Sequence, residues 1–351
     1  MVTVLGGGIA GTALAGALAC SGRPVTVYEQ RHSEGGGAFL ILDGRGHRGL
    51  IALGVPERDL HAASYPLEEL RYTPDDGVTR RRPSEGHRFW LRSDLMTVLN
   101  RFAADAGAEI RYGDPVTKVR VDSVDGTVLR FGDSTVKTGD LVIGADGIDS
   151  VARAGIEPQR STEYAGDVVV YGMTERAVHC PTDPFVLHFD AAAGSGGRPA
   201  ATVGHIWRPG AVAALWFLRI SRAPLPDAET GIRRVGEWAE AVVAAAPGSV
   251  RELTAELVAA TERVHVSNAR NVSLGSAAPP APPVVLVGDA DHAITPAAGV
   301  GAREGIEDVV AVFEAITAEE SPAEAMVIRR RAITEERDRV ARRMRRAAAT
   351  G

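Results

Sequence analysis

Three glycines near the N-terminus have the spacing of a phosphate-binding turn. Gly6, Gly8 and Gly11 form G-x-G-x-x-G between a short apolar segment and a run of small residues. The first glycine permits a tight turn, the second lets a phosphate approach the backbone, and the third lets a helix pack close to a sheet. Ile9 and Ala10 would begin that helix, whose free N–H groups can bind pyrophosphate. The pattern predicts a dinucleotide site and leaves FAD and NAD open.

An acidic residue stands where such sites bind a ribose. Glu29 ends the second predicted strand, 18 residues after Gly11. A carboxylate at this place accepts a hydrogen bond from the ribose 2′-hydroxyl. It also disfavours a 2′-phosphate, which argues against NADP at this site.

A second glycine-rich turn, "GDADHAITPAAGVGAREGIEDV", begins at Gly288 after the apolar run "PVVLV". Asp289 places a carboxylate at the end of a strand, where it can accept hydrogen bonds from ribityl hydroxyls. A helix that opens after the turn can stabilise negative charge on a reduced flavin with its N-terminus. FAD extends beyond its pyrophosphate and needs such a second turn, so the pair of turns favours FAD. The cofactor-binding candidates in this turn are Gly288, Asp289, Pro296, Gly299, Val300 and Gly301.

Composition and charge narrow the function further. The chain has 351 residues, 45% of them hydrophobic, and a net charge of −6. This charge gives no bulk attraction to nucleic acid or to an anionic membrane. The longest uncharged apolar run, Ala211–Leu218, is too short to span a bilayer, and no signal peptide precedes the first strand. We expect a cytoplasmic protein without a nucleic-acid or membrane partner, and no His/Cys spacing indicates a metal.

The order of the motifs predicts two interleaved domains. Strands dominate residues 164–220, helices are predicted at 230–246 and 250–261, and dinucleotide-type motifs occur at both ends of the chain. The fold class is therefore α/β, a Rossmann-like FAD-binding lobe of the GR2 type with an inserted mixed or antiparallel β-sheet substrate lobe and C-terminal helices. The predicted FAD-binding domain comprises residues 1–72, 92–163 and 268–325, the substrate-binding domain residues 73–91 and 164–267, and the C-terminal helix residues 326–351.

Taken together, these motifs resemble the single-component (group A) FAD-dependent aromatic hydroxylases, which have the fold of para-hydroxybenzoate hydroxylase. Two further motifs of that family are present, a D-G pair at Asp146 and Gly147, and an R-x-x-L helix start at Arg92. The resemblance implies that these three residues and Val116 also serve the FAD site. The family pattern G-D-A-x-H-x-x-x-P-x-x-G-x-G-x-x-x-G-x-x-D is met by Gly288, Asp289, Ala290, His292, Pro296, Gly299, Gly301, Gly305 and Asp308.

The resemblance implies a chemistry as well. NADPH or NADH binds transiently and reduces FAD, and a flavin hydroperoxide then delivers one oxygen atom from O2 to a small organic substrate, aromatic or polyketide-like. Hydroxylation, epoxidation and Baeyer–Villiger outcomes stay open. We expect a monomer or weak homodimer from bacterial secondary metabolism. The alternatives are a flavin-dependent reductase or oxidase on the same fold and a non-catalytic or NAD-binding module.

The sequence departs from the family at two places. "AAPPAPP" replaces the Trp that often precedes the last strand, and an acid, Asp291, follows Gly-Asp-Ala. Both departures predict altered local packing around the second glycine turn.

Several residues have competing interpretations. His292 is either a catalytic base or a structural part of the turn under the flavin. Asp43 and Arg45, which follow a glycine-rich segment, either contact flavin or substrate or lie in a solvated turn. The Arg-rich C-terminus is typical of a helix with a solvated face. The candidates for the wall of the substrate pocket are His205, Trp207, Trp216 and Arg219. For the aromatic ones, core packing is the favoured interpretation.

Overall fold

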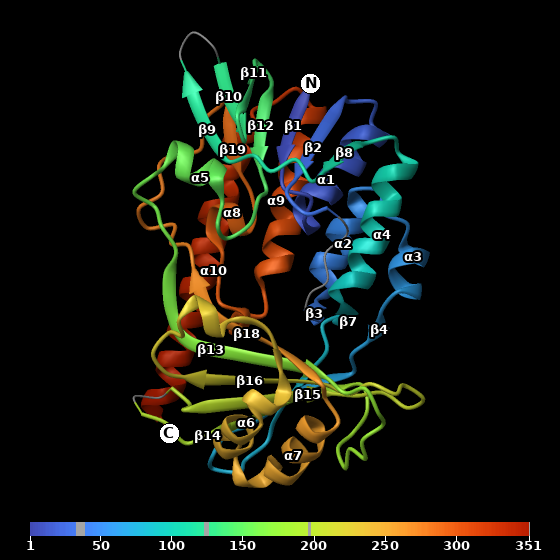
Figure 1. Ribbon diagram of the computed structural model, residues 1–351, viewed down its shortest axis with the longest axis vertical. Coiled ribbons are helices and arrows are strands. Elements are labelled where there is room, and N and C mark those ends of the chain that lie inside the picture. The colour runs from blue at the N-terminus through green and yellow to red at the C-terminus, as the bar shows by residue number, and fades with distance from the viewer. Residues whose placement is uncertain (33–38, 123–125, 196–197, 351) are drawn as a thin grey trace.

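The chain folds into two lobes (Figure 1). The computed structural model describes residues 1–32, 39–122, 126–195 and 198–350. One lobe is built on a five-stranded parallel sheet, and we call it the parallel lobe. The other is built on an eight-stranded sheet, and we call it the sheet lobe. In Figure 1 the parallel lobe lies above the sheet lobe.

The parallel sheet combines segments from both ends of the chain. Its strand order is β19-β12-β1-β2-β8, and every adjacent pair is parallel. The central strands are short apolar runs buried on both faces, as a parallel sheet between two covering layers requires. The strands are β1 (Val2–Leu5), β2 (Val25–Glu29), β8 (Glu109–Tyr112), β12 (Leu141–Gly144) and β19 (Val284–Leu286).

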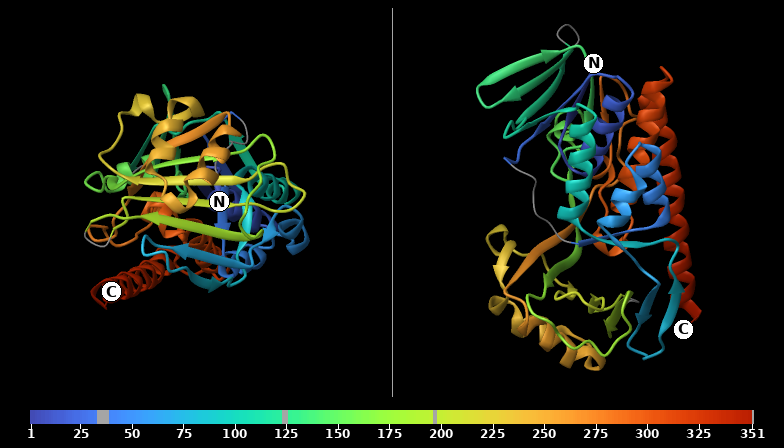
Figure 2. Two further views of the ribbon diagram at one scale, coloured as in Figure 1. Left: turned by 90° about the horizontal axis from the view of Figure 1, so that it is seen from below. Right: turned by 90° about the vertical axis from the view of Figure 1, so that its right-hand side faces the viewer.

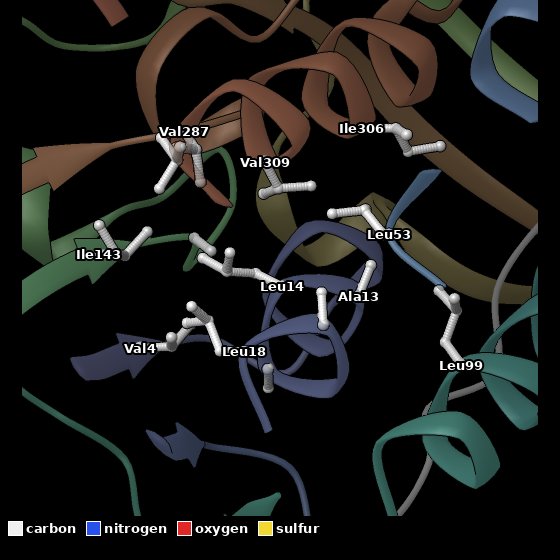
Figure 3. Packing of buried hydrophobic residues seen from close by; sticks show 14 of the residues in the cluster. Val4, Ala13, Leu14, Leu18, Leu53, Leu99, Ile143, Val287, Ile306 and Val309 are labelled. Atoms are coloured by element: carbon white, nitrogen blue, oxygen red, sulfur yellow. The ribbon is translucent and has the colours of Figure 1, made fainter. Parts of the chain in front are cut away.

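Alternation along these strands divides the core into two layers. Side chains on one face, such as Val4 and Ile143, pack with Leu14, Leu99 and Val309 of the helices (Figure 3). Side chains on the other face pack against a small three-stranded sheet and α5 (Val151–Ile156). The helices on the first face are α1 (Ile9–Cys20), α2 (Gly44–Ala52), α3 (Glu57–Ala62), α4 (Arg92–Asp105), α9 (Gly301–Thr317) and α10 (Pro322–Thr350). The small sheet consists of β9 (Lys118–Asp122), β10 (Gly126–Phe131) and β11 (Ser134–Thr138).

The sheet lobe has the strand order β17-β18-β13-β16-β15-β14-β5-β6. Helices α6 (Ala239–Ala245) and α7 (Arg251–Ala259) cover one face, while the other face is directed toward the parallel lobe (Figure 1). This arrangement assigns each residue of a strand to a helix-covered or a lobe-facing side. The strands are β5 (Glu69–Thr73), β6 (Arg80–Pro83), β13 (Glu163–Met173), β14 (Val186–Ala192), β15 (Ala201–Ile206), β16 (Leu215–Ser221), β17 (Gly231–Arg234) and β18 (Arg263–Asn271).

Strand pairing differs from the predicted domain boundaries at two points. β5, of which all but Thr73 falls in the residues 1–72 predicted for the FAD-binding domain, pairs in parallel with β14 of the sheet lobe. β7 (Arg88–Leu91), predicted for the substrate domain, instead pairs with β3 (Phe39–Leu42) and β4 (Tyr65–Pro66). The helix predicted over residues 230–246 is also shorter, because β17 extends the sheet beside β18.

The long C-terminal helix α10 runs along the outside of the molecule and packs against α9 (Figure 2). Among the described residues, no helix is long and apolar enough to cross a membrane. In the same residues no group of three or more His, Cys, Asp or Glu side chains could hold a metal ion.

The contact between α1 and α4 depends on a small residue, and this gives a stability prediction. A Cβ atom on Gly16 would lie 2.4 Å from Cε1 of Phe102, which is buried. We expect Gly16→Ala to lower the free energy of unfolding by ~1–3 kcal/mol, the usual cost of overpacking a core. Gly236→Ala, at a glycine with no atom within 4 Å of the added Cβ, is the control for chemical denaturation. Equal stability of the two variants would contradict this close packing.

Candidate functional site

The first glycine turn, Gly6–Gly11, has two glycines that the polypeptide itself requires. Gly6 has a φ of +99°, and a Cβ there would lie 2.5 Å from the carbonyl oxygen of Ala145. A Cβ on Gly11 would lie 1.9 Å from the carbonyl oxygen of Gly6. The turn therefore packs tightly against the end of β12 and against the first turn of α1.

Gly8 differs from these two glycines. Among the described residues no atom lies within 4 Å of the position of a Cβ added to Gly8, and the φ of Gly8, −80°, suits any residue. Gly8 precedes Ile9 and Ala10, the first residues of α1, and no side chain caps this helix N-terminus. Open space beside backbone N–H donors fits a pyrophosphate group.

Glu29 lies beside the first glycine turn, at the end of β2. One carboxylate oxygen accepts a hydrogen bond from the N–H of Gly7 at 2.6 Å, and the other accepts from the N–H of Arg31 at 2.8 Å. Each oxygen retains a lone pair for a further donor such as a ribose hydroxyl. Val116, between β8 and β9, packs against the cluster that contains Leu5.

In the D-G motif, the Asp146 carboxylate forms hydrogen bonds with the start of α5. Asp146 accepts hydrogen bonds from the Ser150 hydroxyl at 2.5 Å and the Ala152 N–H at 3.0 Å, so it caps α5. Burial raises the pKa of Asp146, even though these donors oppose the shift. Gly147 has open space around its Cα. Arg92 begins α4, and burial lowers the pKa of its guanidinium.

The second glycine turn, Gly288–Gly301, joins β19 to α9. It contains the one-turn helix α8 (Asp289–His292) and a 3-10 turn that begins at Pro296. Gly299 has a φ of +66°, which lets the chain reverse before Val300 and α9. No side chain caps the N-terminus of α9, so its first N–H groups can serve an anionic ligand.

Asp289 is the exposed residue of α8, and it lies beside the start of α9. A Cβ on Gly301 would meet only ordinary contacts, Ile294 at 3.7 Å and the Asp289 carboxylate at 3.8 Å. Asp289 is exposed, yet the surrounding protein desolvates its carboxylate enough to raise the pKa. A carboxylate and free N–H groups around open space fit the ribityl and pyrimidine parts of FAD.

His292 is fixed inside the protein. Its Nε2 lies 2.5 Å from the Asp308 carboxylate, and both side chains are buried. Burial would lower the pKa of His292, but the charge and hydrogen bond of Asp308 outweigh it and raise this pKa. A histidine held in this pair has no open side toward a substrate, which favours its structural interpretation.

Asp43 and Arg45 both form ion pairs at the start of α2, where Arg45 is exposed. Asp43 caps α2 through the N–H groups of Arg45 and Gly46 and pairs with Arg303 of α9 at 3.0 Å. Arg45 forms ion pairs with Glu307 of α9 and Glu336 of α10. Their partners explain their positions without flavin or substrate. The preceding glycine-rich segment, 33–38, lies outside the described residues.

Three of the four pocket-wall candidates lie on the helix-covered side of the eight-stranded sheet. Trp216 donates to Thr261 within the core that includes α6 and α7, and Trp207 packs against the same core. His205 pairs across β15 and β16 with Trp216, so it shares that side. These contacts favour the core-packing interpretation of the three residues, which a substrate between the lobes would not touch. Arg219 is on the lobe-facing side, where it contacts Thr202 and Asp167.

Sequence reasoning missed the aromatic residues of the lobe-facing side. Phe217 lies between Trp216 and Leu218, and the period of two places it on the opposite side from them. Its ring is 5.9 Å from that of Phe189 and 6.2 Å from that of Phe39. Tyr171 lies beside Phe217 in the register of β13 and β16. Alternation in "ALWFLRI" could have separated the two sides.

The sequence matches the family described as FAD binding domain over residues 1–348. It is 30% identical to kynurenine 3-monooxygenase of Salinispora arenicola, over 93% of this chain and 74% of that protein. It is 27% identical to salicylate hydroxylase of Pseudomonas putida, over 88% of this chain and 75% of that protein. The solved structure of CtdE in complex with FAD and substrate 4 has a TM-score of 0.78 at 19% identity, covering 99% of this chain and 89% of that one.

The chain belongs to the group A family of FAD-dependent monooxygenases. FAD is its cofactor, and NAD(P)H as the reductant is typical of this family. The predicted α/β fold and the prediction of an FAD-dependent monooxygenase are confirmed. The residues that hold FAD stay predictions, and the room for a Cβ atom at Gly8 and Gly301 supports them.

Gly301 gives a direct test of the second glycine turn. Because the protein leaves room for a Cβ, we expect Gly301→Val to fold but to displace the flavin from the N-terminus of α9. The reduction potential should fall by about 10 to 40 mV, the equivalent of ~0.3–2 kcal/mol of helix-dipole stabilisation. A spectroscopic potential titration measures this, with Gly248→Val as the control at another open glycine. An unchanged potential with full FAD occupancy would place the flavin elsewhere.

The burial of His205 predicts a pH dependence of stability. Burial, with a smaller effect of His188, lowers the pKa of His205 to about 3. An unfolded histidine titrates near ~6.5, so between pH 6.5 and 3 the unfolded chain binds a proton that the folded chain does not. Stability from this site is therefore present above pH 6.5 and is lost as pH falls, by about 1.4 kcal/mol per unit.

The variant His205→Gln should therefore lose less stability on acidification than the wild type. Urea unfolding between pH 7 and pH 4 measures the difference, and His179→Gln, at an exposed position, is the control. Parallel stability curves for the wild type and His205→Gln would contradict a neutral buried His205.

Proposed function

We propose that this monooxygenase acts on an aromatic substrate that lies between the two lobes, against the lobe-facing side of the eight-stranded sheet. The observation that supports it is the convergence of partly exposed aromatic rings from β3 and from the lobe-facing side of the eight-stranded sheet. Phe39 comes from β3, and its ring is 6.2 Å from that of Phe217 and 6.3 Å from that of Tyr171. Such rings favour a planar apolar ligand, through offset or edge-to-face contacts.

The geometry of β15 supports this aromatic surface. A Cβ on Gly204 would lie 2.1 Å from the ring of Phe217, so the glycine lets that ring lie across the neighbouring strand. Tyr171 stacks on His265, with ring centroids 4.9 Å apart. Together they form a surface with polar atoms at one edge, suited to an aromatic compound with a hydroxyl, amino or carboxyl substituent.

The proposed roles of the cofactor residues follow from their places. Bound FAD supplies hydride acceptance and oxygen activation. Gly8 and the N-terminus of α1 bind the pyrophosphate, and Glu29 binds the ribose. Asp289 accepts hydrogen bonds from the ribityl chain, while the N-terminus of α9 faces the pyrimidine edge of the flavin and stabilises negative charge there.

Isotope labelling tests the reaction. Purified holoprotein is given NADH or NADPH, labelled O2 and a panel of aromatic probes, namely kynurenine, salicylate and 3-amino-4-hydroxybenzoate, named from its relatives. We expect at least one probe to gain one labelled oxygen atom with stoichiometric NAD(P)H oxidation. NAD(P)H consumption that yields only peroxide across a broad aromatic panel would favour the reductase or oxidase alternative.

A substitution tests the proposed surface. We expect Phe217→Ala to raise KM for the accepted aromatic probe about tenfold, since one aromatic contact is worth on the order of 1–2 kcal/mol. The flavin potential should not change. Trp207→Phe, on the helix-covered side, is the control and should leave KM unaltered. If KM were unaffected in folded, FAD-loaded Phe217→Ala, the substrate would not lie on this surface.

Other finer features stay predictions of the sequence. They are the cytoplasmic location, a role in bacterial secondary metabolism, the monomeric or weakly dimeric state, the preference between NADH and NADPH, and the hydroxylation, epoxidation or Baeyer–Villiger outcome.

A further inference from the structure

The one-turn helix α8 carries Asp289 but cannot hold its own shape. It has four residues, and an isolated helical turn is unstable because its nucleation entropy exceeds the gain from one hydrogen bond. Its position must therefore come from contacts with other elements. Guanidinium groups from two directions supply them.

The first direction is the α5 side. Arg153 of α5 donates to the carbonyl oxygen of Ala290 at 2.8 Å. Arg160, which follows α5, donates to the Asp291 carboxylate at 2.8 Å and also pairs with Glu157. Asp291 is fully buried, so its charge is tolerated only because cations surround it.

The second direction is α10, which lies outside all the glycine and acidic motifs of the sequence. Arg330 donates to both oxygens of Asp291, at 2.8 and 2.5 Å. Arg337 donates to the carbonyl oxygen of His292 at 2.8 Å and to the Glu304 carboxylate at 2.6 Å. Glu304 belongs to the first turn of α9. Arg337 therefore bridges the end of α8 and the start of α9.

We propose that Arg330 and Arg337 are positioning residues for FAD, and that α10 is a structural part of the flavin site. They fix α8 and the N-terminus of α9 relative to each other, and so they hold the Asp289 carboxylate and the free N–H groups in one arrangement. They do not touch the flavin themselves. The proposal rests on the proposed contacts of Asp289 and α9 with FAD, and not on oxygenation.

The electrostatics make this arrangement sensitive to a single change. Without Arg337, the one close cation that the described residues leave to the buried Glu304 carboxylate is His292, at 3.9 Å, and His292 is already paired with Asp308. A buried carboxylate without its partner is strongly unfavourable. The start of α9 must then shift toward solvent, which changes the site that binds the flavin.

Binding of two ligands separates positioning from general destabilisation. FAD spans both glycine turns, whereas ADP fits the first turn alone. For apoprotein carrying Arg337→Met, we expect the dissociation constant of FAD to rise about tenfold to a hundredfold, as for the loss of charge-assisted hydrogen bonds. The dissociation constant of ADP should stay within about twofold, because the first turn is unaltered. Arg331→Met is the matched control on an exposed position of α10 and should change neither constant.

Two further variants keep the test decisive. Arg337→Lys retains the charge but not the forked geometry, so its FAD affinity should lie between those of the wild type and Arg337→Met. It replaces Arg337→Met if the latter does not fold. Arg330→Met should also weaken FAD and spare ADP, with faster amide hydrogen exchange at residues 288–294. Unchanged FAD affinity in these variants, or an equal loss of ADP, would overturn the proposal. A protein whose FAD affinity depends on these arginines but which does not oxygenate a substrate would leave the proposal intact.

Discussion

The buried carboxylate of Asp308 fixes the second glycine turn. It accepts a hydrogen bond from the N–H of Gly288 at 3.0 Å and forms ion pairs with His292 at 2.5 Å and Arg329 at 3.0 Å. These partners belong to the end of β19, to α8 and to α10, while Asp308 itself lies on α9. Burial would raise the pKa of Asp308, but His292 and Arg329 lower it, so the carboxylate stays charged. Because a buried charge is tolerated only with its partners in place, the four elements must assemble together.

The need of a buried charge for nearby partners also explains the two places where the sequence departs from its family. Asp291 is acidic because Arg160 and Arg330 meet there, one from each side of α8. The segment "AAPPAPP" lies within the same network, since the Ala278 N–H donates to Glu157 and its carbonyl oxygen accepts from Arg330. Asp291 and the proline-rich segment thus belong to one network of ion pairs and backbone hydrogen bonds. This network fixes the segment that precedes β19.

The sequence predicted those features of the site that depend on neighbouring residues and on the order of motifs along the chain. Glycine spacing, the acid at the end of β2 and the strand before Gly288 each constrain only neighbouring residues, and the structure places each of them at a strand end. The partners of charged residues could not be predicted in the same way. Asp43 meets Arg303 from more than half the chain away, and nothing in the local pattern of either residue indicates the other. The arginines of α10 likewise look solvated in sequence, although Arg330 and Arg337 turn inward.

Which side of the eight-stranded sheet the helices cover could not be predicted for a different physical reason. Alternation along β16 shows that Trp216 and Phe217 point to opposite sides, but it does not show which side the helices cover. That choice depends on α6 and α7, which follow later in the chain and pack over Trp216. The structure uses Trp216 to fill the core and leaves Phe217 partly exposed between the lobes.

The glycines of the two turns separate what the fold needs from what the cofactor needs. At Gly11 a side chain would strike the backbone, so the polypeptide alone requires glycine there. At Gly8 and Gly301 an added Cβ would meet open space or ordinary contacts, and neither has a positive φ. Folding therefore gives no reason for glycine at these two positions, yet both stand at helix N-termini with free N–H donors. A ligand that approaches the backbone closely supplies that reason, and two such positions at separate helix ends match a cofactor long enough to reach both.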